Sequence, residues 1–142
     1  MLATTLHGLL LQGFHRSNRA RISALTPIGL LPGQPKILEF LIHKEGATQK
    51  EIGQGCVLDK STVTSLLSRM IANGLVTKET SPTDGRASLI FLTEKGRALA
   101  KQVEVIGAQV DEQAWQGISP QEQAQFIQTF QKILKNQQKE EN

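Results

Sequence analysis

One segment of the chain carries side chains that suit contact with nucleic acid. Between Leu58 and Gly74, apolar residues recur at three- and four-residue steps, which predicts an amphipathic helix. Asp59 can cap its first turn, and Gly74 can take the left-handed conformation that ends it. Its apolar stripe is Val63, Leu66, Leu67, Met70 and Ile71. Its other face carries short hydroxyls and one cation: Ser61, Thr62, Ser65, Ser68 and Arg69.

This polar face has a chemical use. Small side chains let a helix approach the floor of the DNA major groove, and hydroxyl groups can pair with base edges or phosphates. A solvated helix face that happens to be rich in Ser and Thr is the ordinary alternative. The elements on either side of the helix decide between the two interpretations.

Composition is that of a globular protein. The 142 residues are 39% hydrophobic and 20% charged, which fits a single domain with a real core. The apolar runs are too short to cross a bilayer and no leader pattern opens the sequence, so we expect a cytoplasmic protein with no membrane contact. The single cysteine excludes an internal disulfide. A net charge of +3 permits nucleic-acid binding without demonstrating it.

A second, shorter helix is predicted just before the first. Thr48 and Glu51 have the spacing of a capping box, which predicts a helix that continues to about Gln54. Residues 55–58 then form a tight turn into the helix that carries the polar face. Two helices joined by a short turn containing Gly are typical of a helix-turn-helix.

Two strands are predicted directly after the helix-turn-helix. Residues 75–79 and 87–92 have strand composition, and the loop between them contains Pro82 and an Asp-Gly pair. A hairpin in this place is a wing. Arg86 lies near its tip, where a cation suits the narrow minor groove of A·T-rich DNA.

Four further helices complete the chain. We expect them over residues 3–24, 35–43, 93–117 and 119–136, with caps at Thr93 and at Ser119. The polar tail from residue 137 onward is expected to fray.

The order of these elements and four short motifs resemble the MarR family of bacterial winged-helix transcription regulators. The motifs are residues 59–64 (DKSTVT), 73–76 (NGLV), 84–86 (DGR) and 92–96 (LTEKG). The resemblance extends over nearly the whole chain, and the motifs are specific in combination.

The resemblance implies a fold and an assembly. The fold is mainly α with a small β-hairpin wing, in one regulator domain over residues 1–142. The DNA-binding lobe occupies about residues 34–92, and the dimerisation helices occupy about 3–24 and 93–136. A homodimer would bind a pseudo-palindromic operator. Long terminal helices with broad apolar faces, as here, do need a partner to cover them.

The resemblance also implies roles for particular residues. Arg86 matches a wing arginine that enters the minor groove, and Asp84 matches an acidic residue that holds the hairpin through ion pairing. Thr48, Gln49 and Lys60 lie near helix N-termini and are candidates for phosphate contacts. The residues expected to face bases or neighbouring phosphates are Ser61, Thr62, Ser65, Ser68 and Arg69.

Some residues have an ordinary interpretation beside a specific one. Cys56 could sense oxidants, but its apolar neighbours favour a buried structural role. His7, His15 and His43 do not form a metal-ligand pattern, so we expect no metal. Trp115 is expected to pack in a core or dimer interface rather than to stack on a ligand.

The predicted function is a ligand-responsive repressor that binds double-stranded DNA. No catalytic site is predicted, and no cofactor. Family members often bind a small aromatic or lipophilic effector in a crevice beside the DNA lobe, and one cation of the run Arg16, Arg19 and Arg21 could face that crevice. Two alternatives stay open: an oxidant-sensing regulator that uses Cys56, and a winged-helix module for protein interaction without DNA binding.

Overall fold

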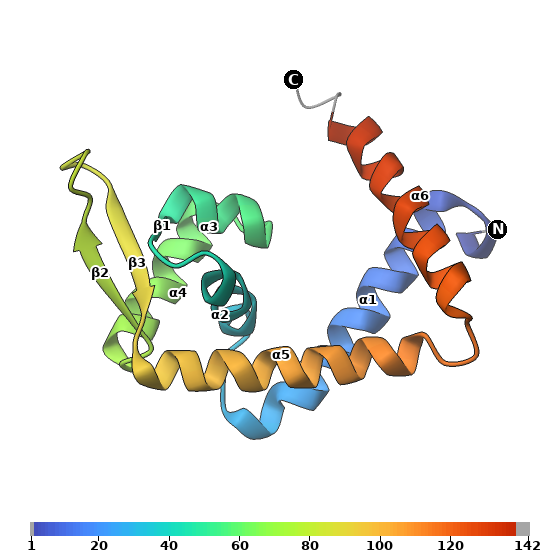
Figure 1. The fold of residues 1–142 in the computed structure, drawn as a ribbon, viewed down its shortest axis with the longest axis horizontal. Coiled ribbons are helices and arrows are strands. Elements are labelled where there is room, and N and C mark those ends of the chain that lie inside the picture. The colour runs from blue at the N-terminus through green and yellow to red at the C-terminus, as the bar shows by residue number, and fades with distance from the viewer. Residues whose placement is uncertain (1, 139–142) are drawn as a thin grey trace. The chain divides into compact units, whose positions relative to one another are not determined.

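The computed structural model describes residues 2–138 (Figure 1). The chain forms two compact units, Met1–Val110 and Asp111–Asn142. The elements in chain order are η1 (Leu2–Thr4), α1 (Leu6–Leu25), η2 (Thr26–Ile28), α2 (Gln34–His43), β1 (Ala47–Thr48), α3 (Gln49–Cys56), α4 (Lys60–Ala72), β2 (Val76–Thr80), β3 (Ser88–Leu92), α5 (Glu94–Ala114) and α6 (Pro120–Gln138). None of the helices within the described residues is long and apolar enough to cross a membrane.

The predicted wing is part of a three-stranded antiparallel sheet in the order β1-β3-β2. β2 pairs with β3 from Val76 opposite Leu92 to Thr80 opposite Ser88. β1 adds a third strand beside Leu89 and Ile90. The sequence did not predict β1, because a strand of two residues is too short to show alternation.

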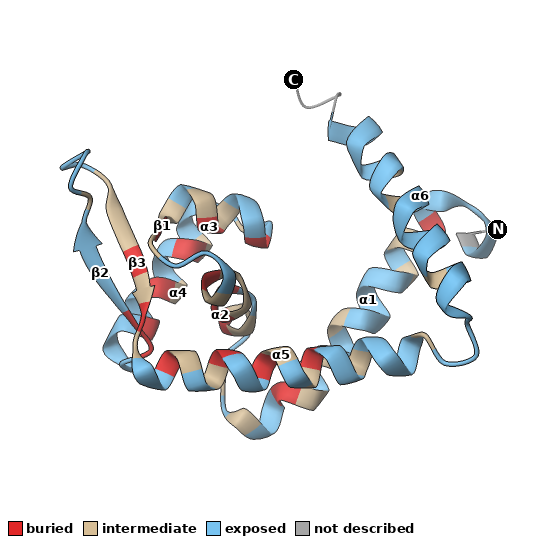
Figure 2. Cartoon of the chain, in the orientation of Figure 1, coloured by how far each residue is buried: buried red, intermediate tan, exposed pale blue. Residues whose placement is uncertain are grey.

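The core of the first unit lies between α2, α3, α4 and the sheet (Figure 2). Its fully buried side chains include Ile37, Leu38, Leu41, Ile52, Val63, Leu67, Met70 and Ile90. Ala100 and Val103 of α5 also belong to this core. The first half of α5, which the resemblance assigned to dimerisation, therefore also packs in the core of the lobe.

The ends of α4 are those predicted. The Asp59 carboxylate accepts the N–H of Thr62 at 2.8 Å, and Gly74 has a φ of +73°. The apolar stripe is narrower than expected. Ile71 is 41% exposed and Leu66 is half-buried, because both lie to the side of the buried line formed by Val63, Leu67 and Met70.

The capping box of α3 is complete. The Thr48 hydroxyl accepts the N–H of Glu51 at 3.2 Å, and the Glu51 carboxylate accepts the N–H of Thr48 at 3.0 Å. Lys44 lies 2.7 Å from the same carboxylate. The hydrogen bond from Lys44, followed by those from Thr48, lowers the pKa of Glu51 to about 2. α3 continues to Cys56, two residues beyond the predicted end.

The two C-terminal helices begin at their predicted caps. The Thr93 hydroxyl accepts the N–H of Gly96 at 3.0 Å, and the Ser119 hydroxyl accepts the N–H of Glu122 at 3.1 Å. α5 ends at Ala114, three residues before the predicted end, because a turn closed by the N–H of Ile118 on the Trp115 carbonyl follows it. α6 includes residues 137 and 138, which we expected to fray, and the rest of that tail lies outside the described residues.

The start of α5 lies directly against the backbone that leads into β2. A Cβ atom on Gly96 would overlap the carbonyl oxygen of Leu75 and lie 2.9 Å from its carbonyl carbon. The same oxygen accepts the backbone N–H of Thr93 at 3.0 Å. A residue without a side chain is therefore needed where α5 crosses the base of the wing.

Replacing Gly96 with Ala should destabilise the fold by about 1–3 kcal/mol, because backbone on both sides must move apart. Helix propensity alone would give a gain of about 1 kcal/mol. The reverse change at the exposed Ala98, Ala98→Gly, measures that propensity difference in the same helix. Urea unfolding of the two variants gives both values, and a stabilised Gly96→Ala would contradict the close packing.

The lowered pKa of Glu51 predicts a pH-dependent contribution to stability. Because the folded pKa lies below the ordinary value of 4.5, the contribution is present above about pH 4.5 and is lost as the pH falls toward 2. Glu51→Gln should therefore lower the free energy of unfolding at about pH 7, with a smaller difference at about pH 3. Glu79→Gln, in the exposed part of β2, is the control. A Glu51 difference that does not shrink at low pH would count against the charged capping box.

Candidate nucleic-acid interface and adjoining cavity

α4 separates buried residues from an open polar face. Val63, Leu67 and Met70 are at most 1% exposed. On the opposite side lie four exposed residues that the sequence predicted for DNA contact: Ser61, Ser65, Ser68 and Arg69. At 3.6 residues per turn, these four positions fall on one side of the helix. The structure thus brings this part of the predicted site together.

Thr62 lies at the border of that face. Its side chain is half-buried and lines a cavity beside α4. The resemblance grouped it with the DNA-facing residues because its position matches one where family members contact bases or neighbouring phosphates. In the helix it points about 100° away from Ser61, since each residue advances by that angle.

The N-terminus of α4 is organised by Asp59. The Ser61 hydroxyl donates to the Asp59 carboxylate at 2.8 Å. The N–H of Thr62, followed by this hydroxyl, lowers the pKa of Asp59. Lys60 is exposed as the first residue of the helix. A fixed carboxylate and an exposed ammonium group therefore lie side by side where the helix begins.

The two other candidates for phosphate contact lie at the start of α3. Thr48 and Gln49 are both half-buried. The Thr48 hydroxyl donates to Glu51 at 3.1 Å and accepts the N–H of the same residue. Its hydroxyl hydrogen is therefore used within the chain.

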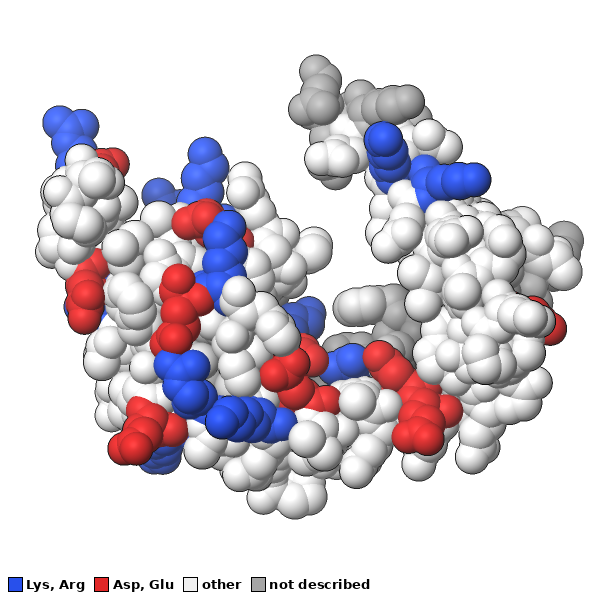
Figure 3. Space-filling model, viewed as in Figure 1, with Lys and Arg blue, Asp and Glu red and all other residues white. Residues whose placement is uncertain are grey.

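The wing loop, residues 81–87, is held by its own backbone. The N–H of Ser81 donates to the carbonyl of Ala87 at 2.9 Å. The Asp84 carboxylate accepts the N–H of Arg86 at 3.1 Å, and within residues 2–138 it makes no ion pair. Asp84 thus stabilises the loop by a hydrogen bond to the backbone and not by the implied ion pairing. The Arg86 side chain is exposed, and basic atoms project at the far end of the wing (Figure 3).

Glu45 joins the base of the wing to α5. Its carboxylate accepts the N–H of Leu92 at 3.0 Å and a guanidinium N–H of Arg97 at 2.6 Å. The Arg97 hydrogen bond lowers the pKa of Glu45. The sequence did not predict this junction, because Glu45 and Arg97 are 52 positions apart and no local pattern connects them.

A cavity of about 610 Å³ lies inside the first unit, beside the flank of α4 between its open and buried sides. Its walls are mainly apolar and come from α1, the segment after α1, α2 and α4. The residues that matter for its chemistry are Asn18, Arg21, Leu30, Lys36, Glu39, Leu58, Thr62 and Leu66. Of the three cations in the basic run of α1, Arg21 lines this cavity.

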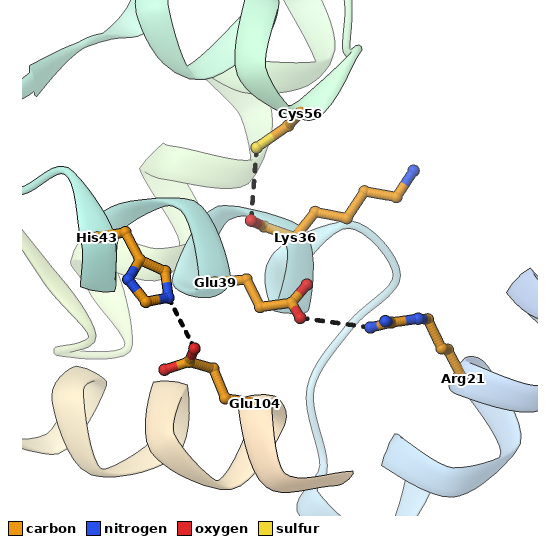
Figure 4. Close-up of polar contacts among 6 residues, drawn as sticks. All are labelled: Arg21, Lys36, Glu39, His43, Cys56 and Glu104. Carbon is orange, nitrogen blue, oxygen red and sulfur yellow. Dashed lines mark hydrogen bonds and ion pairs between the residues drawn. The ribbon is translucent and has the colours of Figure 1, made fainter. Parts of the chain in front are cut away.

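Of the two cations that line the cavity, one is paired with a carboxylate and the other is not (Figure 4). Arg21 donates to the Glu39 carboxylate at 3.3 Å. Lys36 makes no ion pair within residues 2–138, and its ammonium nitrogen lies 5.9 Å from the centre of the Phe14 ring. The positive charge of Arg21 is therefore balanced locally, whereas that of Lys36 is not.

Cys56 is a buried residue of the last turn of α3, not of the following turn where the sequence placed it. Its thiol donates to the carbonyl of Lys36 at 3.4 Å (Figure 4). Burial raises its pKa, which reduces the reactive thiolate fraction. These features agree with the predicted structural role.

Trp115 and the histidines occupy ordinary positions. In the second unit the Trp115 ring packs edge-to-face on Phe126, with ring centres 5.9 Å apart, as expected of a packing residue. His43 lies 2.7 Å from a Glu104 carboxylate oxygen. His7 and His15 are exposed on α1.

The sequence of this chain is similar to those of known transcription regulators. Residues 28–87 match the sequence model of the MarR family. The transcriptional regulator HosA of Escherichia coli O111:H- is 31% identical over 101 residues, which are 71% of this chain and 75% of that protein.

Solved structures agree with the sequence comparison. A MarR-family transcriptional regulator from Silicibacter pomeroyi superposes with a TM-score of 0.86 at 29% identity, over 96% of this chain and 92% of that one. CouR from Rhodococcus jostii RHA1, solved bound to p-coumaroyl-CoA, superposes with a TM-score of 0.81 at 25% identity, over 94% of each chain. With its helix-turn-helix, its wing and these relatives, the chain belongs to the MarR family of winged-helix transcription regulators.

Proposed function

We propose that this regulator represses transcription by binding a pseudo-palindromic operator as a homodimer, and that a small effector releases it from DNA. The observation that carries the proposal is the division of α4, which buries one side in the lobe and leaves a polar side open. In this proposal residues 1–142 function together as a single regulator domain. Because its target is DNA, we place the protein in the cytoplasm.

The open face of α4 has the size and chemistry of a major-groove surface. Ser61, Ser65 and Ser68 are short enough for the helix to approach base edges closely, and Arg69 can reach a phosphate or a guanine. Ser61 donates its only hydroxyl hydrogen to Asp59, so toward DNA it can only accept. It therefore suits an exocyclic amino group of adenine or cytosine.

The wing and the helix N-termini supply the contacts that carry less sequence information. The exposed Arg86 is proposed to enter the minor groove beside the site. Lys60 and Gln49 are proposed to contact phosphates. Thr48 was a third candidate, but its hydroxyl hydrogen and its N–H both go to Glu51, so we propose that it holds the start of α3 in place beside the phosphates. The small polar face and Arg86 together argue against a winged helix used only for protein interaction.

The terminal helices carry the apolar surface that a homodimer requires. Large hydrophobic side chains are exposed on α1 and α6: Leu6, Leu9, Leu11, Phe14, Ile22, Phe126, Ile127 and Leu134. A set of this size is unusual on a monomeric surface. A second copy of the chain would cover it and place two copies of α4 along one duplex.

The cavity behind α4 is the proposed effector site. Its walls are apolar, and Arg21 and Glu39 neutralise each other, so Lys36 leaves one positive charge in excess. An amphipathic monoanion matches these properties. Leu58, Thr62 and Leu66 form part of the wall, so an occupant would touch the helix that faces DNA. The solved complex of CouR with p-coumaroyl-CoA supports a small-molecule effector in this family.

The wing assignment predicts a loss of DNA affinity in Arg86→Ala. Binding to the operator should weaken by about 1–3 kcal/mol. The slope of the logarithm of the binding constant against the logarithm of the salt concentration should become shallower by about one unit per protomer, because one cation per wing is removed. Fluorescence anisotropy with duplexes from the protein's own upstream region, at two salt concentrations and with a scrambled duplex as competitor, measures both.

Lys101→Ala, which removes an exposed lysine of α5, is the matched control for that experiment. Equal affinity and equal salt dependence of Arg86→Ala and wild type would remove Arg86 from the interface. Binding of wild type that the scrambled duplex competes away equally well would contradict sequence-specific recognition.

The charge of the cavity predicts which compounds bind. 2-Naphthoate should bind and release the operator, whereas its neutral amide, 2-naphthamide, should bind at least roughly tenfold more weakly, because it lacks the charge that Lys36 attracts. Lys36→Met should lower the affinity for the acid but not for the amide. Calorimetric titration measures this, with Lys101→Met as control. Equal affinity for acid and amide would contradict an anionic effector.

A further inference from the structure

The turn between α3 and α4 contains a residue in a costly conformation. Val57 has φ +55° and ψ +51°, and among residues 2–138 it is the only non-glycine residue with positive φ. The left-handed region is disfavoured for β-branched side chains, so such a residue is a genuine outlier. The conformation is imposed locally, because the N–H groups of Val57 and Leu58 both donate to the carbonyl of Gly53.

The side chain gains nothing within the chain in return. Val57 is 86% exposed, more than any other large hydrophobic residue found exposed in the described part of the molecule. Glycine would satisfy the same backbone without strain. A strained and solvent-facing valine therefore points to a partner outside the chain.

The position of Val57 indicates DNA as that partner. Asp59, Lys60 and Ser61 follow it after the half-buried Leu58, at the end of the helix whose first residues approach base edges in a helix-turn-helix. Its immediate neighbours Cys56 and Leu58 are buried and half-buried, and the exposed residues within three positions of it are not apolar: Gln54, Gly55, Asp59 and Lys60. One isolated valine is too small an apolar patch for docking a protein. The apolar group that base pairs present in the major groove is the C5-methyl of thymine.

We propose that Val57 is a specificity-determining residue that contacts a thymine C5-methyl group in each half of the operator. The inference rests on the proposed DNA-binding function and adds to it a contact from the turn rather than from the helix. At 86% exposure the methyl groups of Val57 are open to a partner, and a β-branched side chain has few χ1 rotamers in which to place them.

The test removes methyl groups from the DNA and, separately, from the protein. In the operator found by anisotropy, each thymine is replaced in turn by uracil, which deletes only the C5-methyl group. Wild type, Val57→Gly, Val57→Ala and the control Ile71→Ala, which truncates an exposed apolar residue of α4, are measured against every duplex. Thermal unfolding of the four proteins is measured in parallel.

Wild type and Ile71→Ala should lose affinity at one thymine per half-site, by roughly fourfold for each methyl group that leaves the contact. Val57→Gly and Val57→Ala should bind the thymine duplex more weakly and show no response to uracil at that position. Val57→Gly should also melt at a higher temperature than wild type, because the strain is gone.

Two results would overturn the inference. In the first, Val57→Gly binds the operator as tightly as wild type. In the second, it binds more weakly but responds to uracil at the same positions as wild type, which would trace the loss to a looser turn. A wild-type protein that prefers no duplex would instead defeat the proposed DNA-binding function, and this is visible before any Val57 variant is used.

Discussion

The structure depends on the burial of one side of α4. Val63, Leu67 and Met70 pack in the centre of the lobe, so the helix cannot rotate about its axis without exposing them. The serine side and Arg69 are therefore fixed in the direction opposite to the core. The caps at Asp59 and Gly74 set the length of the helix, and the sheet and α5 close the core around it. A binding surface made of short side chains needs this rigidity, because such side chains cannot compensate for a misplaced backbone.

The third side of the same helix would connect DNA binding with the proposed effector. Thr62 and Leu66 lie between the buried side and the open side, in the wall of the cavity beside Lys36 and the Arg21–Glu39 pair. A compound that fills the cavity touches α4 directly, so no long chain of intermediates is required to change its position. In the proposed mechanism, neighbouring residues of α4 thus attach the helix to the core and contact the effector.

Local signals in the sequence predicted most of this arrangement. Capping residues and the 3.6-residue period identified α3, α4 and both C-terminal helices, and the hairpin loop identified the wing. The features that the sequence did not predict have physical causes. β1 is too short to show a period, and Ile71 lies at the edge of its stripe. The Glu45–Arg97 bond joins positions far apart in sequence, and Thr62 could be assigned to the cavity only once the helix had a neighbour on that side. The unusual backbone of Val57 had no signal at all, because valine is not a residue that predicts a left-handed turn.

The outer strand of the sheet has a further consequence for the molecule in solution. β2 lies at the edge, so its free backbone groups could pair with a strand of another molecule. From Thr77 to Thr80 all its side chains are exposed, and they include Lys78 and Glu79. Charged side chains on a strand of five residues make strand addition unfavourable. The wing can therefore project far enough to reach DNA without becoming a site of aggregation.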